Sequence, residues 1–248
     1  MNSILFNHRS IRKFKATPIA ENTLQIILEA AARASNTGNM QLYSIIVTKN
    51  AALKKELCKR VHFGQAMVDE APVVLTFCAD LNRFSHWCDL RNTTPGYDNY
   101  LSFYTASIDA TIAAQNACIK AEIEGLGVYY LGTTNYNTDA LIEILELPKL
   151  VFPVTTLVIG YPNEQPELTE RLPLNGIVHE EKYKTYTNDA INSIHLDKEQ
   201  LEVNKEFVRI NNTENLAQIF AEKRYTKKNN ELFSEKLISD IKNQGFLK

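Results

Sequence analysis

The spacing of apolar residues predicts alternating helices and strands over the first 161 positions. In residues 21–34, apolar side chains recur at three- and four-residue intervals, which places them on one face of a helix. Short β-branched or apolar runs, typical of buried strands, recur between such segments. The expected helices in this group are residues 21–34, 51–61 and 138–145. The expected strands are residues 42–48, 73–79, 128–131 and 154–161.

Residues 105–124 have the most informative pattern. Four isoleucines, at 108, 112, 119 and 123, lie along one side of the expected helix, and alanines cover much of the rest. A helix that is apolar nearly all round is buried. Its alanines would permit close approach of another helix, in the same chain or in a partner. Strands separated by such helices indicate a three-layer α/β/α architecture of the α+β class with a mixed sheet.

The character of the chain changes after residue 162. From 197 to 248, 19 of the 52 residues are charged. An amphipathic helix is still expected there, with Phe233, Leu237, Ile238 and Ile241 on one face and Gly245 as its stop. We therefore predict a core over residues 1–186 and a helical C-terminal extension over residues 187–248.

Composition narrows the function classes. The net charge is −2, with 44% hydrophobic and 23% charged residues. This balance predicts neither a nucleic-acid partner nor a membrane partner, since both favour a basic excess. Because no apolar run has the length of a signal peptide or a membrane span, a cytoplasmic location is expected.

The sequence contains no motif for a metal site or for a nucleophilic side chain. The four cysteines, at 58, 78, 88 and 118, have no zinc or redox spacing, and the five histidines are scattered. His86 and Cys88 are close in sequence, but two ligands are too few for a metal and a surface turn is the expectation there. We assign no metal and no catalytic side chain.

Two polar segments in the N-terminal part could bind a ligand. His8-Arg9-Ser10-Ile11-Arg12 places two forked guanidinium groups and a hydroxyl together, as a phosphate requires, although a solvated basic face would look the same. Residues 35–41, Ser-Asn-Thr-Gly-Asn-Met-Gln, could present amides to the edge of a planar heterocycle. An ordinary turn would also explain that loop.

Two later segments are weaker alone. Residues 126–133, Leu-Gly-Val-Tyr-Tyr-Leu-Gly-Thr, match neither the dinucleotide fingerprint nor a P-loop and are interpreted as a strand with a turn. Arg171, just before an apolar residue and Pro173, could reach a phosphate from a loop.

Together these segments resemble the FMN-dependent nitroreductase family. The chain has His-Arg-Ser-Ile-Arg-x-Phe from residue 8, then Ser-x-x-Gly-Asn-x-Gln from residue 35. Ala-Ala-Gln-Asn-Ala from residue 113 resembles the long central helix of that family. Gly-Tyr-Pro from residue 160 and Arg-Leu-Pro-Leu from residue 171 resemble its larger, NADPH-preferring flavin-reductase branch. The resemblance covers about residues 4–186.

The resemblance implies an FMN site and a homodimer. The phosphate would be held by His8, Arg9, Ser10, Arg12 and Arg171. The flavin would be lined by Ser35, Asn36, Thr37, Asn39 and Gln41, in part from the partner chain, and by Gln65, Tyr130, Leu131 and Gly132. The branch usually has a lysine two residues before the arginine at 171. Here Thr169 stands in its place and removes one positive charge.

The resemblance also implies the chemistry. Hydride would pass from NADPH or NADH to FMN, and then to a nitroaromatic, a quinone or a free flavin in a ping-pong cycle. Arg209 would meet the extra phosphate of NADPH, unless it is a solvated charge balancing nearby glutamates. Two alternatives remain open: a dedicated flavin reductase, and a flavin-binding module without turnover.

Overall fold

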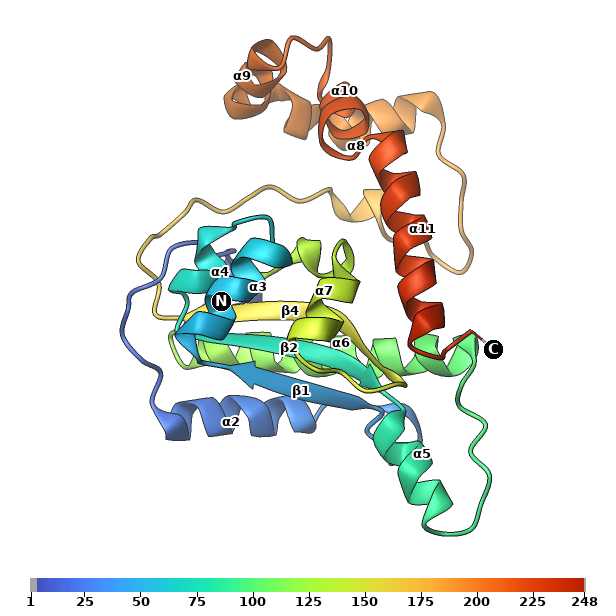
Figure 1. Ribbon diagram of the computed structural model, residues 1–248. Helices are drawn as coiled ribbons and strands as arrows, with labels where there is room; N and C mark the ends of the chain where they lie inside the picture. Colours follow the sequence, from blue (N-terminus) through green and yellow to red (C-terminus); the bar gives the residue numbers. More distant parts are fainter. Residues whose placement is uncertain (1–3, 248) are drawn as a thin grey trace. The chain divides into compact units, whose positions relative to one another are not determined.

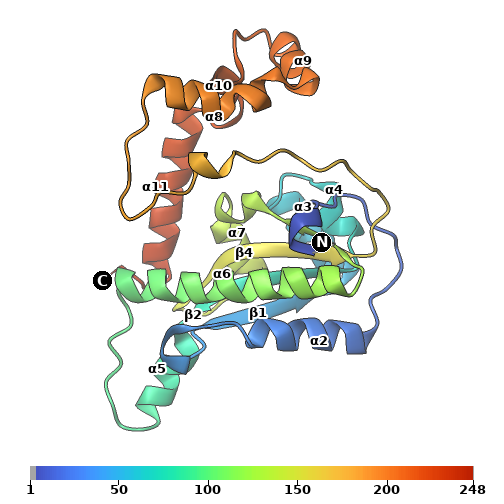
Figure 2. The same ribbon diagram turned by 180° about the vertical axis from the view of Figure 1, so that it is seen from behind.

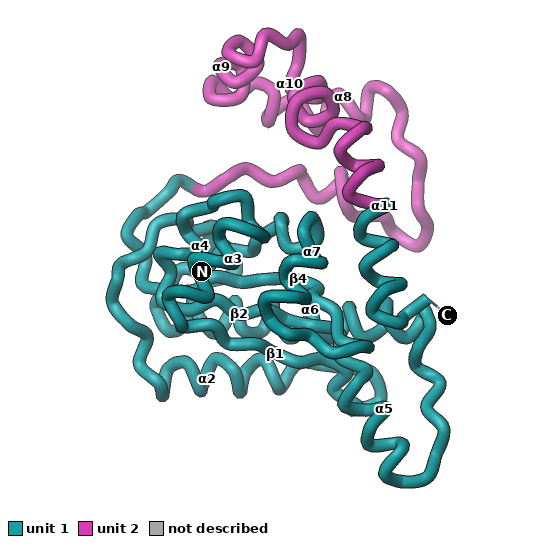
Figure 3. Tube along the Cα trace, viewed as in Figure 1, with its two compact units in different colours: residues 1–167, 235–248 teal, residues 168–234 magenta. Residues whose placement is uncertain are grey.

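The structure is a computed structural model that describes residues 4–247. The chain divides into two compact units (Figure 3). Unit 1 comprises the residues up to Glu167 and those from Glu235 onward, and unit 2 comprises Leu168–Ser234. Residues 168–186, which the sequence placed with the core, therefore group with the extension, whereas the C-terminal residues return to unit 1.

Unit 1 is built on a four-stranded sheet in the order β1-β2-β4-β3. The strands are β1 (Tyr43–Thr48), β2 (Val73–Asp80), β3 (Gly127–Tyr130) and β4 (Val151–Gly160). Every neighbouring pair is antiparallel. The α+β class is confirmed. The sheet formed by these strands is antiparallel, not mixed as expected. A parallel pairing occurs in the isolated bridge between Ser10 and Val128.

Helices cover both faces of this sheet, so the three layers are as predicted (Figures 1 and 2). On one face lie α2 (Glu21–Ala32) and α6 (Tyr100–Ile123). On the other lie α3 (Ala51–Arg60), α4 (Ala66–Glu70) and α7 (Thr138–Ile144). Successive side chains of a strand point to opposite faces. Accordingly Leu75 and Phe77 pack with α2 and α6, whereas Val74 packs in the other cluster.

The remaining elements of unit 1 are short. They are α1 (Ile4–Asn7), η1 (Thr37–Asn39), α5 (Asn82–Asp89) and η2 (Gly132–Asn135). The expected surface turn at His86 and Cys88 is wrong, because both residues lie on α5.

The central helix α6 differs from its prediction in two ways. It begins at Tyr100, five residues before the predicted start, because the Asn99 side chain accepts a hydrogen bond from Ser102 N (3.0 Å) and caps it. Its alanines are buried within the chain, in the cluster formed with α2 and the sheet. The exposed side instead carries Leu101, Tyr104, Ile108 and Ile112. We call these four residues the apolar stripe of α6.

Strand β4 begins at Val151, three residues before its predicted start. The predicted strand began one residue after Pro153, and proline is rare inside strands because it cannot donate to the ladder. Pro153 is accommodated opposite Cys78, where the register between β2 and β4 shifts. Proline is tolerated at such an irregularity because no ladder hydrogen bond is required there.

Two paired glycines position the N-terminal segment against the sheet. Gly127 of β3 and Gly160 of β4 are partners in the ladder. A Cβ on Gly127 would lie 2.8 Å from Ile11, and a Cβ on Gly160 would lie 2.5 Å from Pro72 and 3.0 Å from Phe14. We call this pair the glycine notch. Ile11 and Phe14 fill it and are buried, while residues between them stay exposed.

The end of the chain is anchored in unit 1. Helix α11 (Lys227–Asn243) begins in unit 2 and ends in unit 1. Phe246 is fully buried, with its ring 5.0 Å from that of Phe103. Gln244 donates to the carbonyl oxygens of Pro148 (3.2 Å) and Val151 (2.9 Å). Of the predicted apolar face, Ile241 is buried and Ile238 is exposed.

Unit 2 is helical, as the extension was predicted to be. Its elements are η3 (Leu174–Gly176), α8 (Asn188–Gln200), α9 (Glu202–Ile210), α10 (Leu216–Gln218), the π-helix η4 (Ile219–Arg224) and the start of α11. Ile194, Leu216 and Ile219 are its buried apolar residues. In residues 4–247, no helix is both long and apolar enough to cross a membrane.

The glycine notch generates a test of the fold. Gly127→Ala should lower the free energy of unfolding by about 1–3 kcal/mol, because the new methyl group would overlap Ile11. Gly96→Ala is the matched control, since a Cβ there meets nothing within 4 Å. Urea denaturation of both variants measures the difference. Equal stability of the two would show that Ile11 moves aside at no cost.

Candidate functional site

The predicted phosphate segment lies along the edge of the sheet beside β3. Ile11 N donates to Val128 O (2.9 Å), and Lys15 N donates to Tyr161 O (2.9 Å). Since Ile11 is buried in the glycine notch, Arg12 and Lys13 project outward. The backbone thus keeps Arg12 and Lys13 at the surface while Ile11 and Phe14 are buried.

Arg9 carries the clearest sign of a missing partner. Its Nη1 donates to Asn7 O (3.0 Å), but its Nε is buried and has no hydrogen-bond partner among the described residues. A buried donor without a partner costs free energy. Arg9 also lines a cavity of about 370 Å³ together with two carboxylates, Glu122 and Glu164, which already have partners in His8 and in the backbone N–H groups of Arg12 and Lys13. An anionic group in this cavity would satisfy the guanidinium.

The neighbouring groups are partly engaged within the protein. The Arg12 guanidinium lies 4.8 Å from the centre of the Tyr129 ring. The Glu164 carboxylate accepts from the backbone N–H groups of Arg12 (2.5 Å) and Lys13 (3.0 Å). Arg12 therefore stacks on β3 while its fork remains exposed, as a phosphate ligand requires.

His8 is tied to the far end of α6. Its Nδ1 lies 2.8 Å from Glu122 Oε1. Together with buried Cys118, these residues offer donor atoms within 4.8 Å of one another, a spacing that could hold a metal ion. The direct His8–Glu122 hydrogen bond already accounts for the contact. In this structure His8 therefore anchors the start of the phosphate segment.

The loop at residues 35–41 is held by its own amides. Asn36 Oδ1 accepts from Gln41 N (3.1 Å) and Gln41 Nε2 (3.2 Å), and Gln41 Nε2 also donates to Asn39 Oδ1 (2.6 Å). Gly38, Asn39 and Gln41 have positive φ angles of 56°, 56° and 47°. Glycine and asparagine tolerate this conformation best. Ser35, Thr37 and Asn39 remain exposed.

A buried carboxylate that the sequence analysis missed anchors this loop. Asp109 of α6 is only 2% exposed and accepts from Thr37 N (3.0 Å) and Thr37 Oγ1 (3.0 Å). The Arg83 side chain of α5 also donates to Gln41 O. An acidic residue on the alanine face of a buried helix was the available signal for Asp109, because a buried charge needs partners.

The flavin-ring residues of the prediction lie beside the phosphate segment. Tyr130 ends β3, whose Val128 bridges Ser10, and Leu131 is buried in one cluster with Ile11. Gln65 Nε2 donates to Thr133 Oγ1 (3.1 Å), and His62 Nδ1 lies 2.9 Å from the same oxygen. The prediction missed His62, which no motif marks, and gave no role to Thr133, the last residue of the 126–133 segment.

The structure thus brings the predicted residues of unit 1 into two groups. The first joins residues 8–12, Gln65 and residues 130–132, and the second is the loop at 35–41. Their anchors on α6, Glu122 and Asp109, are 13 residues apart, or about 20 Å at the rise of an α-helix. One chain therefore holds the two groups at separate places.

The predicted residues of unit 2 have partners of their own. Arg171 Nη1 donates to Thr169 Oγ1 (2.7 Å), so the threonine that replaces the expected lysine orients the arginine. Arg209 makes two hydrogen bonds to Glu206, at 2.5 and 2.7 Å. This ion pair is the glutamate-balancing arrangement that was the alternative for Arg209.

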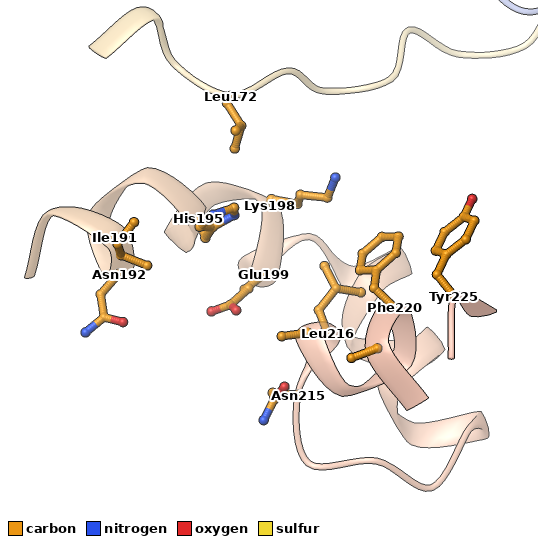
Figure 4. A pocket seen from close by; sticks show the side chains of 12 residues that line it. Leu172, Ile191, Asn192, His195, Lys198, Glu199, Asn215, Leu216, Phe220 and Tyr225 are labelled. Carbon is orange, nitrogen blue, oxygen red and sulfur yellow. The ribbon is translucent and has the colours of Figure 1, made fainter. Parts of the chain in front are cut away.

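Unit 2 also contains a cavity of about 830 Å³ (Figure 4). Its wall includes Phe220 and Tyr225, whose rings are nearly parallel at 6.4 Å, and Lys198, which lies 5.6 Å from the Phe220 ring centre. Leu172, next to Arg171, lines it too. Phe220 and a further residue of the wall, Ala221, belong to the π-helix η4.

Fold and site together define an α+β protein whose sheet edge carries an arginine segment and a hydrogen-bonded polar cluster. The model of the Nitroreductase family matches residues 5–161. An FMN reductase [NAD(P)H] of Bacillus subtilis is 39% identical over 181 residues, 72% of each chain. An oxygen-insensitive NADPH nitroreductase of Salmonella typhimurium is 35% identical over 73% of each.

A solved structure is similar to this one over almost the whole chain. A protein from Bacteroides fragilis NCTC 9343 superposes with a TM-score of 0.96 at 49% identity, covering 98% of this chain and 99% of that one. The chain belongs to the nitroreductase family.

Buried His62 generates a pH prediction. Burial lowers the pKa of His62 from its usual 6.5 to about 4. The unfolded chain therefore takes up a proton near pH 6.5 that the folded chain refuses until about pH 4. Between these values the free energy of unfolding should fall by up to about 3 kcal/mol as the pH drops.

Replacing the imidazole should remove this pH-dependent part of the free energy of unfolding. Urea denaturation of wild type and His62→Asn, from neutral pH down to pH 4, measures it. His86→Asn is the control, because His86 is exposed. If wild type and His62→Asn lose stability in parallel, other groups cause the acid sensitivity.

Proposed function

We propose that this chain is an FMN-dependent NAD(P)H oxidoreductase that reduces nitroaromatics, quinones or free flavins. The observation that carries the proposal is Arg9, whose buried Nε lacks a partner beside a cavity at the sheet edge. Family membership supports it, since relatives are named as an FMN reductase that uses NAD(P)H and as an NADPH nitroreductase.

The residues present fit FMN. Its phosphate is a dianion, and Arg9, Arg12 and Ser10 offer forked donors and a hydroxyl on one short segment. His8 would complete this segment, and Arg171 would add a further guanidinium. Bound FMN supplies two-electron hydride chemistry, which none of the side chains of this protein can supply alone.

The protein's own contribution is binding and orientation. Tyr130, Leu131 and Gly132 would offer backbone groups to the ring, and Gln65 would contact it with an amide that is already held by Thr133. No side chain is assigned as an acid, a base or a nucleophile. One open pocket would serve the nicotinamide and then the acceptor, which gives ping-pong kinetics.

The decisive experiment is an absorption spectrum of the purified protein, followed by anaerobic titration with NADPH and with NADH. We expect a yellow protein with one FMN per chain that bleaches on addition of the nicotinamide. A colourless protein that also fails to bind added FMN would overturn the proposal. A flavin that is bound but not reduced would favour a flavin-binding module.

Arg12 should contribute strongly to FMN affinity. A hydrogen bond to a charged group is worth about 1.5–3 kcal/mol, so Arg12→Ala should weaken binding by about tenfold to a hundredfold. Lys13→Ala is the control, because Lys13 is an adjacent exposed cation. Fluorescence titration of FMN measures both. An equal, small loss in the two variants would identify Arg12 as a solvated charge.

We also propose that the protein is a homodimer. The apolar stripe of α6 is open, with Leu101 73% and Tyr104 55% exposed. A contiguous apolar face of this kind is typical of an interface. The two groups of predicted site residues are separated along α6 within one chain. Two chains could unite them, if the loop at 35–41 of one chain served the phosphate segment of the other.

A charge on the stripe should therefore cost both the dimer and the flavin. Ile108→Glu is expected to lower the mass measured by light scattering to that of one chain and to release FMN. Asn22→Glu, an exposed position on α2, is the control. A monomeric wild type that retains FMN would contradict the proposal.

We propose that NADPH is the preferred donor and that Arg209 meets its additional phosphate. To do so, Arg209 must exchange Glu206 for the phosphate, and its planar fork suits either partner. Arg209→Ala should then lower kcat/KM for NADPH and leave the value for NADH nearly unchanged. An equal loss with both donors would refute the assignment and direct attention to Lys223, Lys227 and Lys228.

A cytoplasmic location is part of the same proposal. All four cysteines are unpaired, and three of them are buried. Free thiols are typical of proteins in a reducing compartment.

A further inference from the structure

Three side chains form a small hydrogen-bonded unit beside the predicted flavin segment. His62 follows α3, Gln65 precedes α4, and Thr133 lies on η2 directly after Gly132. Thr133 Oγ1 is the shared atom, 2.9 Å from His62 Nδ1 and 3.1 Å from Gln65 Nε2. The backbone fixes the pair on the other side, because Gln65 N donates to His62 O (3.0 Å).

The burial of His62 decides which ring nitrogen carries the proton. His62 is 0% exposed, and its Nε2 has no partner among the described residues. A buried N–H without an acceptor is rarer and costlier than a buried acceptor without a donor. We therefore assign the proton of the neutral ring to Nδ1, so that Nδ1–H donates to Thr133.

This tautomer determines what Thr133 can do. A hydroxyl oxygen has two lone pairs and one hydrogen. His62 Nδ1–H and the Gln65 amide each donate to this oxygen, so both lone pairs are occupied. The hydroxyl hydrogen is the remaining group, and it must point away from both donors.

Thr133 directly follows Gly132, one of the residues predicted to meet the flavin ring. Thr133 is half-buried, and the preceding Gly132 is exposed, with nothing within 4 Å of the position of a Cβ. On the basis of the function proposed above, we propose that Thr133 donates this hydrogen bond to the flavin ring. His62 is then a positioning residue that sets the direction of the hydroxyl.

The unit presents only uncharged donors. Because burial lowers the pKa of His62 to about 4, the imidazole stays neutral at physiological pH and adds no cation beside the ring. The cluster therefore carries no charge over that range.

Substitution of Thr133 tests the contact itself. Thr133→Val removes the hydroxyl at nearly constant volume and should weaken FMN binding by about three- to tenfold, the usual value of one neutral hydrogen bond. It should also shift the visible absorption bands and the midpoint potential of the bound flavin. Thr133→Ser keeps the hydroxyl and should restore all three. Thr76→Val is the matched control, because Thr76 is buried in β2 with an unpartnered hydroxyl.

Substitution of His62 tests the positioning role. His62→Leu removes the donor and should lower FMN affinity in the wild-type background but add no loss to Thr133→Val. His62→Asn places an amide N–H at the position of Nδ1 and should recover most of the affinity. Thermal unfolding of each variant separates loss of fold from loss of contact. The Thr133 pair gives an answer even if His62→Leu unfolds.

The outcomes are distinct. Unchanged affinity, spectrum and potential in Thr133→Val would overturn the proposed contact. Additive losses in the double variant would overturn the role of His62 as a positioning residue, because linked residues give non-additive effects. Failure of the wild type to bind FMN would overturn the proposed function itself, before any variant is compared.

Discussion

The close packing of Ile11 and Phe14 against two paired glycines is the contact on which the site depends. Gly127 and Gly160 face each other in the β3–β4 ladder, and neither has room for a Cβ. Ile11 and Phe14 are buried there, so the extended segment between them cannot rotate without exposing one of them. Arg12 must then face outward, and Ser10 must lie beside Val128. Apolar burial, which has no directionality of its own, thereby orients the charged groups.

The long helix α6 anchors the other polar segments of the site. Its alanine face packs inside the chain, and its two acidic residues are the attachment points for the two polar segments. Asp109 holds the loop at 35–41 through Thr37, and Glu122 holds His8. The spacing of these carboxylates fixes the distance between the loop and the phosphate segment. The exposed side of the same helix carries the apolar stripe, so the proposed dimer interface and the anchors of the site would share one element.

Much of the fold could be predicted from the sequence because the spacing of apolar residues indicates which face of a helix or strand is buried. The helices around residues 21–34 and 51–61 and the buried strands were found within a few residues. The predictions failed where a local contact overrode the pattern. Asn99 caps α6 earlier than the alanine pattern begins, and Pro153 lies in a strand because the register shifts opposite Cys78. Arg9 and Arg12 were marked by their own segment and given a role by the resemblance, and Thr133 was marked only as the end of the 126–133 segment, whereas Asp109 and His62 carry no motif. Their roles depend on contacts between residues distant in sequence, such as Thr37 with Asp109.

The charges of unit 1 are arranged as a hydride-transfer enzyme would need them. Cationic groups gather in the segment of Arg9 and Arg12, where an anionic phosphate would need compensation. The cluster of His62, Thr133 and Gln65 has no charge, because burial keeps the imidazole neutral. A neutral, preorganised environment holds a planar ring through hydrogen bonds without competing for protons. A buried imidazolium at His62 would cost desolvation energy and would place a positive charge in this cluster. The apolar packing that positions the arginines also reaches the neighbourhood of this imidazole, since Val61, next to His62, belongs to the same buried cluster as Ile11 and Leu131.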